Sequence, residues 1–320
     1  MKKPYLAVFI IMPLFFLCSL NALDLKTTWF NGKKYVYLKD IARYYGMNLS
    51  TNKKYANLTS RYSNLKFTYN SKKGEINNTI VYYLYAPAYI SGQPIINIKD
   101  FQYIIEPILR SKALKKQNVK TVIIDPGHGG KDRGAKGRIV KEKDITLKIA
   151  KKLADILSVN GFKVIITRNR DVYKSLNARP ALASYYNADI FISIHCNSAA
   201  SNVKGIETYI YPPAGTPSTS SIRASSYKRQ NGDLYAVNSA RLGYEIQKSL
   251  LRTGSPDRGV KHARFAVLRL SKVPSVLIET GFLSSTSEEI RLNSYNYQKK
   301  LASYIADGII KYKQAVSQGT

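Results

Sequence analysis

The chain has 320 residues, of which 44% are hydrophobic and 11% aromatic; this is typical of a folded protein with room for two domains and excludes a disordered one. Its 50 Lys and Arg outnumber 20 Asp and Glu, and the net charge of +30 favours a polyanionic partner: nucleic acid, an acidic membrane surface or an anionic cell-wall polymer. The two cysteines, Cys18 and Cys196, exclude a framework of disulfides.

Residues 1–22 have the features of a secretory signal peptide. Two lysines follow Met1, an apolar run extends from Leu6 to Leu20, and Leu20-Asn21-Ala22 is a tolerable cleavage site. We therefore expect a secreted protein of the cell envelope, which stays clear of nucleic acid and has no stable membrane insertion after cleavage. An uncleaved membrane anchor is the alternative, because Leu20 is bulky for its position. Lipidation at Cys18 is disfavoured because the preceding residue is not small.

Residues 24–116 are predicted to form a small α+β domain with an internal repeat of 60 residues. Gly32 to Gly46 and Gly92 to Glu106 each show a period-2 strand that runs into a short amphipathic helix. This segment resembles the small domains related to the copper amine oxidase N-terminal domain, although it contains no histidine or cysteine for a copper site. Because it holds 16 Lys and Arg against 5 Asp and Glu, it is either a salt-sensitive wall-binding module or a folded spacer. In either case we expect its deletion to leave the chemistry largely intact.

From residue 117 to residue 320, strands and helices alternate, which predicts an α/β domain with a mainly parallel sheet and helices on both faces. The polar stretch Ser111–Lys120 is the expected linker. A long loop, Pro212–Asp233, is expected to line or cover a cleft. The expected strands are Thr121–Ile124, Lys163–Thr167, Asp189–Ile194, Gly205–Tyr211, Arg264–Leu268 and Ser275–Ile278, and the expected helices are Lys141–Val159, Tyr173–Tyr186, Leu234–Leu251 and Tyr297–Tyr312.

Three of these strands end next to a side chain that can bind a metal or transfer a proton. His128 follows the first strand in a glycine-rich turn, His195 follows the strand Asp189–Ile194, and Glu279 follows Ser275–Ile278. Glu142 opens the helix Lys141–Val159 on its inward face, three residues before Ile145. Because parallel strands bring their carboxyl ends to one edge of a sheet, we expect these four side chains to meet there.

Two imidazoles and one carboxylate would leave zinc a fourth position for water, as in hydrolytic zinc sites, and a further carboxylate would shuttle protons. Cys196 should point away from this site as a small core residue, because it follows His195 on an alternating strand. Arg179 and Asn187 are expected near the ends of a helix. His262 is expected to be exposed, with a position at the edge of the cleft as the alternative.

The second half of the chain, Thr121 to Tyr312, resembles the zinc-dependent N-acetylmuramoyl-L-alanine amidases that trim bacterial peptidoglycan. The resemblance rests on DPGHGGKDRGAKG, KEKDITL, ADIFISIHCNS, DRGVKHARFAVLR and VPSVLIETGFL. It implies a twisted sheet with helices on both sides, zinc ligands at His128, Glu142 and His195, and a catalytic glutamate at Glu279. It further implies cleavage of the amide between N-acetylmuramic acid and the L-alanine of the stem peptide by zinc-activated water. Ser285 and Cys196 depart from the usual pattern without touching these four positions.

This resemblance makes peptidoglycan the expected partner and the periplasm or the bacterial cell wall the expected location. A need for an activator protein stays open. The alternatives are a zinc peptidase that cuts within the stem peptide, which would lack these motifs, and a non-catalytic wall-binding protein, which would be expected to lose a ligand or Glu279. A nucleic-acid binder would explain the charge of +30 but not the signal segment.

Overall fold

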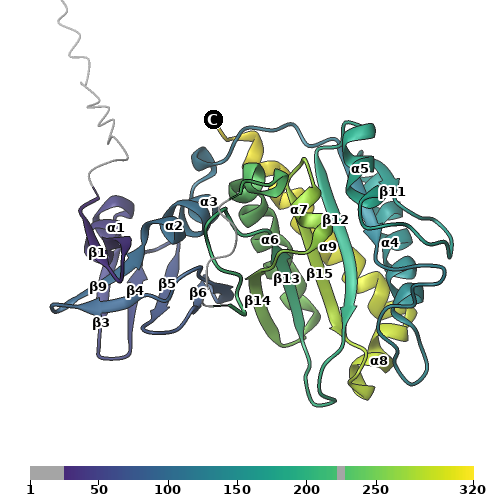
Figure 1. Ribbon diagram of the computed structural model, residues 1–320, viewed down its shortest axis with the longest axis horizontal. Coiled ribbons are helices and arrows are strands. Elements are labelled where there is room, and N and C mark those ends of the chain that lie inside the picture. Colours follow the sequence, from purple (N-terminus) through teal and green to yellow (C-terminus); the bar gives the residue numbers. More distant parts are fainter. Residues whose placement is uncertain (1–24, 222–227) are drawn as a thin grey trace, which may run out of the picture.

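The computed structural model describes residues 25–221 and 228–320, so the predicted signal peptide lies outside the described residues. No helix in these two ranges is long and apolar enough to span a membrane. An eleven-stranded sheet runs across the molecule (Figure 1). Its strands follow in the order β11 (Lys163–Ile166), β10 (Thr121–Pro126), β12 (Ile190–Asn197), β15 (Ser275–Phe282), β13 (Ile206–Ile210), β14 (Asp257–His262), β7 (Thr79–Tyr82), β6 (Lys73–Ile76), β5 (Asn64–Thr68), β4 (Tyr55–Thr59) and β3 (Asn48–Thr51).

The part of this sheet formed by residues 121–282 is mainly parallel, as predicted. Strands β11, β10, β12 and β15 are parallel neighbours, whereas β13 is antiparallel to β15 and parallel to β14. Three strands extend further than the sequence predicted, since β10 ends at Pro126, β12 at Asn197 and β15 at Phe282. His195 and Glu279 therefore lie within the ladder, where hydrogen bonds on both sides fix their backbone.

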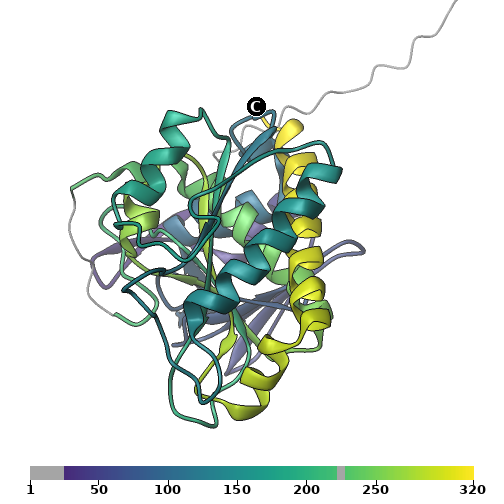
Figure 2. The ribbon, with the colours of Figure 1, turned by 90° about the vertical axis from the view of Figure 1, so that its right-hand side faces the viewer.

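Helices cover both faces because side chains alternate along the buried strands. Ile123 and Phe191 pack on one face with α5 (Ala178–Tyr185) and α7 (Ala266–Leu270). Ile124 and Ile192 belong to the larger core on the other face, which includes α4 (Glu142–Val159), α6 (Ala236–Leu250) and α9 (Tyr295–Ser317). In Figure 2 the yellow helix α9 lies beside α4 on this second side. A short helix, α8 (Thr286–Asn293), connects β15 to α9.

Two predicted elements in this part of the chain were placed wrongly. The predicted strand Arg264–Leu268 is a turn followed by α7, and the strand is the preceding β14. Val267 and Leu268 are adjacent and both buried, a spacing that suits a helix and that a strand with one exposed face cannot give. The predicted helix Tyr173–Tyr186 begins only at Ala178, because the Ser175 hydroxyl accepts a hydrogen bond from the Ala178 N–H and closes a turn ahead of it.

The first part of the described chain, residues 25–110, is called the N-terminal module here. Both copies of its repeat form a strand followed by a helix, as predicted: β2 (Lys33–Tyr37) leads into α1 (Leu38–Tyr45), and β9 (Gln93–Asn97) leads into α2 (Ile98–Asp100). The second helix continues through a π-helical turn, Phe101–Ile105, into α3 (Glu106–Leu109). Strands β2 and β9 pair with each other in a separate four-stranded sheet with β1 (Thr27–Phe30) and β8 (Ala88–Ile90).

The N-terminal module and the α/β part of the chain, residues 117–320, share one hydrophobic core and one sheet. Val81 of β7 pairs with Val260 of β14, and the Asp257 carboxylate accepts a hydrogen bond of 2.7 Å from the Ile80 N–H. On the core side, the Arg241 guanidinium of α6 donates to the carbonyls of Pro107 and Ile108, at 3.2 and 3.0 Å. The predicted linker therefore joins two parts that are packed together, and removing either part would expose apolar surface on the other.

Arg241→Ala tests whether the two parts unfold together. Arg241 is largely buried and also pairs with Glu245 at 2.7 Å. Its loss therefore leaves two buried carbonyls and a carboxylate without their hydrogen-bond donor. We expect the free energy of unfolding to fall by about 1–3 kcal/mol, with one calorimetric transition that shifts as a whole. Arg252→Ala removes an exposed pair with Asp307 and is the matched control, expected within about 0.5 kcal/mol of the parent. Two transitions of which only one moves would contradict a shared core.

Candidate metal centre and catalytic site

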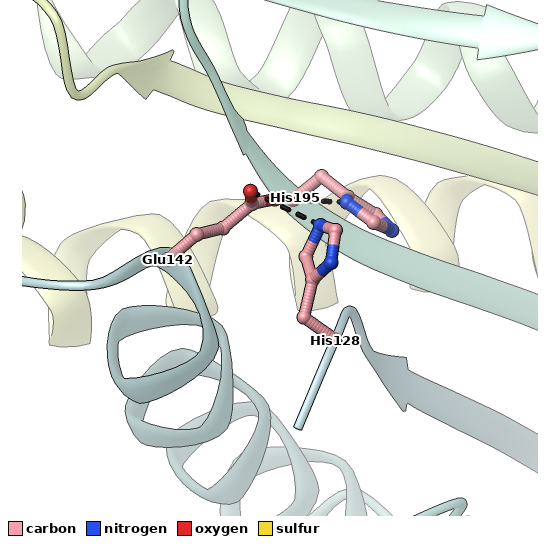
Figure 3. Close-up of side chains that lie close together, drawn as sticks. All are labelled: His128, Glu142 and His195. Atoms are coloured by element: carbon pink, nitrogen blue, oxygen red, sulfur yellow. Dashed lines mark hydrogen bonds and ion pairs between the residues drawn. The ribbon is translucent and has the colours of Figure 1, made fainter. Parts of the chain in front are cut away.

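Three of the four predicted site residues meet at one edge of the sheet. His128 follows β10, His195 lies near the end of β12 and Glu142 is the first residue of α4. Figure 3 shows both imidazole rings directed at the Glu142 carboxylate. The carboxylate lies 3.1 Å from His128 Nε2 and 2.9 Å from His195 Nδ1, and one ligand atom from each residue fits within 4.8 Å of the others. The structure thus brings three of the four predicted residues together.

The loop after β10 holds His128 in a strained conformation. Its φ of 62° lies in the left-handed region, which a residue with a side chain adopts only when its surroundings enforce it. Two contacts supply that constraint: the Asp132 carboxylate lies 2.9 Å from Nδ1, and the Arg179 guanidinium donates a 2.8 Å hydrogen bond to the His128 carbonyl. Because Asp132 contacts Nδ1, the other ring nitrogen, Nε2, is the one directed at Glu142. This arrangement is typical of metal-binding histidines.

Gly127 is required by the position of the second imidazole. A Cβ atom at residue 127 would lie 2.4 Å from Cε1 and 2.5 Å from Nε2 of His195. The glycine thus allows the loop after β10 to approach β12 closely enough for the two imidazole rings to stand 4.9 Å apart.

A buried polar network beneath the site was missed by sequence reasoning. Asp125, at the end of β10, is fully buried and accepts hydrogen bonds from Thr167, Arg179 and Ser193 at 2.6–2.9 Å. Arg168, also buried, donates to the carbonyls of Pro126, Gly127 and Lys143. An aspartate inside an apolar strand was the available signal, because a buried carboxylate needs a cationic or hydrogen-bonding partner. These two arginines fix the loop that carries His128.

The electrostatics of the cluster are set by the contacts of Glu142. Burial alone would raise the pKa of its carboxyl group, but hydrogen bonds and charge from His128 and His195 outweigh burial and hold the pKa well below its usual range. For His128, burial would lower the pKa, yet Glu142 and Asp132 together raise it above 6.5. Backbone N–H groups of Cys196 and Ala135 also donate to Glu142, at 3.0 and 2.7 Å. The site therefore holds an ionised carboxylate between two imidazoles.

Glu279, the fourth predicted residue, stands beside the cluster on the next strand. It is the register partner of His195 and is only 8% exposed. Its Oε2 atom is buried and has no hydrogen-bond partner among the described residues. Burial, followed by the charges of Glu142 and Glu207, raises its pKa well above the usual value. A carboxyl group in these surroundings readily holds a proton, which suits acid and base catalysis.

His128, His195 and Glu279 face one cavity of about 320 Å³. The cavity lies on the sheet face that carries α5 and α7, and its wall includes both polar and apolar side chains. The other lining residues are Asp125, Asp132, Tyr173, Lys174, Leu176, Arg179, Phe265, Ala266, Val267 and Leu277. A substrate in this cavity would therefore meet the two imidazoles and Glu279 together.

Glu207 forms a second buried cluster next to Glu279 that the sequence did not reveal. The two glutamates are register partners across β13 and β15. Glu207 is 1% exposed and accepts hydrogen bonds from Asn197, Tyr209 and Arg258 at 2.8–2.9 Å, and from the Lys261 ammonium. Hydrogen bonds from Lys261 and its neighbours outweigh burial and lower the pKa of Glu207. The site thus contains one glutamate with a lowered pKa directly beside one with a raised pKa.

The remaining predictions about individual residues had mixed outcomes. Cys196 is buried on the face opposite His195, with its thiol 3.3 Å from the Thr280 hydroxyl, as predicted for a core residue. The prediction of an exposed His262 was wrong: its ring is buried, and burial followed by the charges of Lys72 and Arg264 lowers its pKa to about 3. Asn187, with φ of 48°, lies in the turn between α5 and β12.

The loop Pro212–Asp233 was expected to line or cover the cleft, but none of its described residues lines the cavity. Because β13 is antiparallel to β15, the end of β13 from which this loop departs lies at the edge of the sheet opposite the site. The loop instead contacts the N-terminal module, where the Lys72 ammonium donates to the carbonyls of Ser218 and Ser221 at 3.0 and 2.6 Å. This contact gives the described part of the loop a structural role.

Comparisons with known proteins agree with this arrangement. The profile of a family described as N-acetylmuramoyl-L-alanine amidase matches residues 122–311. The N-acetylmuramoyl-L-alanine amidase LytC of Bacillus subtilis is 37% identical over 195 residues, a match that covers 60% of this chain and 35% of LytC. The chain therefore spans only about a third of the length of LytC.

Two solved structures are similar to the same part of the chain. An N-acetylmuramoyl-L-alanine amidase from Clostridium difficile 630 superposes with a TM-score of 0.52 and 36% identity, over 61% of this chain and 97% of that one. The CwlD amidase from Clostridioides difficile, solved in complex with the GerS lipoprotein, has a TM-score of 0.51 and 33% identity, over 60% of this chain and 98% of that one. The segment matched by the family profile includes all four predicted site residues and excludes the N-terminal module.

Gly127→Ala tests the close packing of the site. The added methyl group cannot coexist with the His195 ring where it stands, so the ring must move away from Glu142. We expect the affinity for a divalent metal to fall by about 10-fold to 100-fold, the usual effect of misorienting a ligand, in a protein that still folds. Gly161→Ala, where an added methyl group meets open space, should cost some stability and leave metal affinity unchanged. Metal affinity at the parent level in Gly127→Ala would contradict the arrangement in Figure 3.

Proposed function

The chain belongs to the N-acetylmuramoyl-L-alanine amidase family, and from this membership we propose how its residues hydrolyse the amide between N-acetylmuramic acid and L-alanine in peptidoglycan. It is a hydrolase of the bacterial cell wall. The proposal assigns His128, Glu142 and His195 to a zinc ion and Glu279 to proton transfer. The observation that carries it is the unpartnered Oε2 of Glu279 beside the cluster of His128, Glu142 and His195, with Glu279 and both imidazoles lining one cavity.

The donor set fits zinc on chemical grounds. Two imidazoles and one carboxylate are typical ligands of a catalytic zinc site, which keeps one position open. The orientation of His128 by Asp132, and the space that Gly127 leaves for the ring of His195, are what such a centre needs. Zinc held by these residues would supply a Lewis acid that lowers the pKa of a bound water to about 7. The contacts of the Glu142 carboxylate with both imidazoles bring the three side chains together.

Glu279 is proposed to carry the proton of the reaction. Its carboxylate form accepts a proton from the attacking water, while the oxygen of that water bonds to the carbonyl carbon of the lactyl group. Its acid form then donates the proton to the nitrogen of L-alanine as the C–N bond breaks, which releases the stem peptide with a free amine. A raised pKa favours this role, because Glu279 then keeps the accepted proton until the departing nitrogen takes it. Glu207, which remains ionised beside it, helps to keep that pKa high.

The N-terminal module and the location of the protein are also matters of proposal. We propose that residues 1–22 direct the chain to the envelope, that residues 24–116 form an accessory domain that holds the enzyme on the wall, and that residues 117–320 form the catalytic domain. The basic composition of the module supports this role, since the wall polymer is anionic. The CwlD structure contains a lipoprotein partner. A partner protein for this chain is proposed on the same pattern.

Removal of zinc should abolish activity, and its return should restore it. His195→Ala should lose the metal, since it removes one of three ligands. Because the pKa of His128 is raised above its usual value, the metal must displace a proton from this ring at pH values below that raised pKa. We therefore expect zinc affinity to fall as the pH falls through that raised pKa. Calorimetry in buffers of different ionisation enthalpy should show more proton release at pH 6 than at pH 9.

The raised pKa of His128 has the opposite effect on the folding stability of the metal-free protein, which falls as the pH rises. The pair of His128 with Glu142 contributes stability that is fully present below pH 6.5 and is lost as the pH rises through the raised pKa of His128.

Full activity in a sample shown by elemental analysis to lack metal would contradict the zinc assignment.

Glu279→Gln is the sharpest test of the proposed mechanism. Glutamine preserves size and a hydrogen-bonding oxygen but cannot carry a proton, so the variant should hold about one equivalent of zinc while turnover falls at least ~100-fold. Turnover is measured as free stem peptides released from purified sacculi, by mass spectrometry, which also distinguishes cleavage at L-alanine from cleavage within the peptide. Glu288→Gln is the control, because this buried glutamate accepts N–H bonds from Gly205 and Phe282 and does not line the cavity. Near-normal turnover with intact zinc in Glu279→Gln would overthrow the assigned role.

A further inference from the structure

The sheet face that carries Glu279 continues beyond the catalytic half into the N-terminal module. Residues directly opposite each other on neighbouring strands point to the same face. Glu279 on β15 is opposite Glu207 on β13, and Tyr209 of β13 is opposite Lys261 of β14. The pairing of Val81 with Val260 places Tyr82 of β7 beside Lys261. Tyr82 thus stands on the same face as the catalytic glutamate, three strands away.

The same face extends over the antiparallel strands that follow. Lys73 of β6 is opposite Tyr82, and Lys66 of β5 is opposite Glu75 on the same strand as Lys73. Tyr55 of β4 lies two residues from Asn57, the register partner of Lys66. We call the set Tyr55, Lys66, Lys73, Tyr82 and Lys261 the strand platform. At a strand spacing of about 4.8 Å, the platform begins roughly 10 Å from the Glu279 strand, at β14, and extends to roughly 29 Å, at β4.

One face of these strands is buried and the other meets solvent. The alternate residues Leu58, Leu65, Phe67, Ile76 and Val81 are at most 1% exposed and belong to the core. On the platform face, Lys73 is exposed and the side chains of Lys66 and Glu75 are 45% and 39% exposed, while Tyr55 and Tyr82 are half-buried. A sheet face that adjoins an active site and retains aromatic rings in contact with solvent is suited to a ligand.

The chemistry of the platform combines aromatic rings with ammonium groups. The Lys66 ammonium lies 5.4 Å from the centre of the Tyr55 ring, and the Lys261 ammonium lies 5.5 Å from that of Tyr82 and 5.8 Å from that of Tyr209. Tyrosine offers an apolar face and a polar hydroxyl, which suits the alternating C–H and hydroxyl surfaces of a sugar ring. Lys66 and Lys261 are paired with Glu75 and Glu207, so the exposed Lys73 offers the cation for the free carboxylates of stem peptides. A polymer of sugar rings that bears anionic peptides matches both.

We propose that the strand platform binds the glycan strand of peptidoglycan on one side of the bond that is cleaved, so that the N-terminal module extends the active site. This inference rests on the proposed function, because it takes the substrate class from it. Lys261 connects the two regions, since its ammonium contacts Glu207 while its position adjoins Tyr82. The N-terminal module then supplies affinity for long substrates at the place where the chemistry occurs, and is more than a tether to the wall.

The test compares two substrates with the full chain. Tyr82→Leu replaces the ring while keeping apolar volume, and Lys73→Glu reverses a charge at an exposed position that should not affect folding. With long, uncrosslinked glycan strands bearing stem peptides, we expect each variant to raise KM by about fivefold to tenfold with little change in kcat. With a single disaccharide–peptide, kcat/KM should equal that of the parent. Tyr62→Ala, whose side chain is 83% exposed in the β4–β5 turn, and Lys300→Ala on α9 are the matched controls and should match the parent on both substrates.

Each other outcome has a distinct meaning. If the parent releases no stem peptide from either substrate, the proposed function fails, whereas parent-like KM of both platform variants on long strands overturns the platform alone. Equal losses on both substrates would assign Tyr82 and Lys73 to folding or to the chemistry and would also overturn it. A last measurement is sedimentation of Glu279→Gln with sacculi, with and without Tyr82→Leu. Binding that salt abolishes and Tyr82→Leu leaves unchanged would show general attraction to an anionic polymer and overturn a glycan-specific platform.

Discussion

The hydrogen bonds accepted by the buried Glu142 carboxylate are the interactions on which the rest of the catalytic half depends. A carboxylate that is only 4% exposed is expensive unless every lone pair is used, and here two imidazoles and two backbone N–H groups use them. Those donors come from the loop after β10, from β12 and from the chain ahead of α4. One side chain therefore requires three segments to meet, and a displacement of any of them would leave a buried charge unpaired. The cluster proposed to hold a metal and the packing of α4 on the sheet are consequences of the same requirement.

The strain at His128 is explained by the network underneath it. Asp125 and Arg179 form a fully buried ion pair at 2.8 Å, and Arg179 and Arg168 between them bind the carbonyls of residues 126, 127 and 128. Such a pair contributes little net stability, because desolvation offsets most of the attraction, but breaking it would be costly. Its effect is to allow a single path for the loop. A residue in the left-handed region can thus be retained where its ring is needed, and the free energy of the strain is compensated by contacts outside the site.

Sequence reasoning succeeded where a single local rule decided the structure. Apolar runs that end in Asp, His or Glu predicted the strands and the shared edge, so His128, His195 and Glu279 could be placed without knowledge of contacts. The register of β12 against β15 then brought His195 and Glu279 to the same level. Reasoning failed where two rules competed or where partners were distant in sequence. Residues 264–268 are apolar enough for a strand or a helix, and only the structure shows that Val267 and Leu268 lie on a helix packed against Ile123 and Phe191. His262 is buried, contacts Thr219 and lies near the charge of Lys72 in the N-terminal module, and its own neighbours in sequence could indicate neither of these partners.

The two halves of the chain pack together because the edge strand of a sheet needs a partner for its backbone groups. Without the N-terminal module, β14 would present its N–H and C=O groups as an open edge, which invites pairing with other chains. Strand β7 covers that edge. The two strands pair at Val81 and Val260, and the geometry of β14 explains why this pairing is short. Gly259, with φ of +84°, turns the backbone of β14 so that Ile80 can approach, and a Cβ at this position would lie 2.6 Å from the Ile80 side chain. The Ile80 N–H that finds no ladder partner is taken instead by the Asp257 carboxylate. The glycine and the aspartate both lie in β14, so the catalytic half itself carries the features that accept the module. Extension of the sheet, and with it of the face beside Glu279, is therefore built into both halves of the chain.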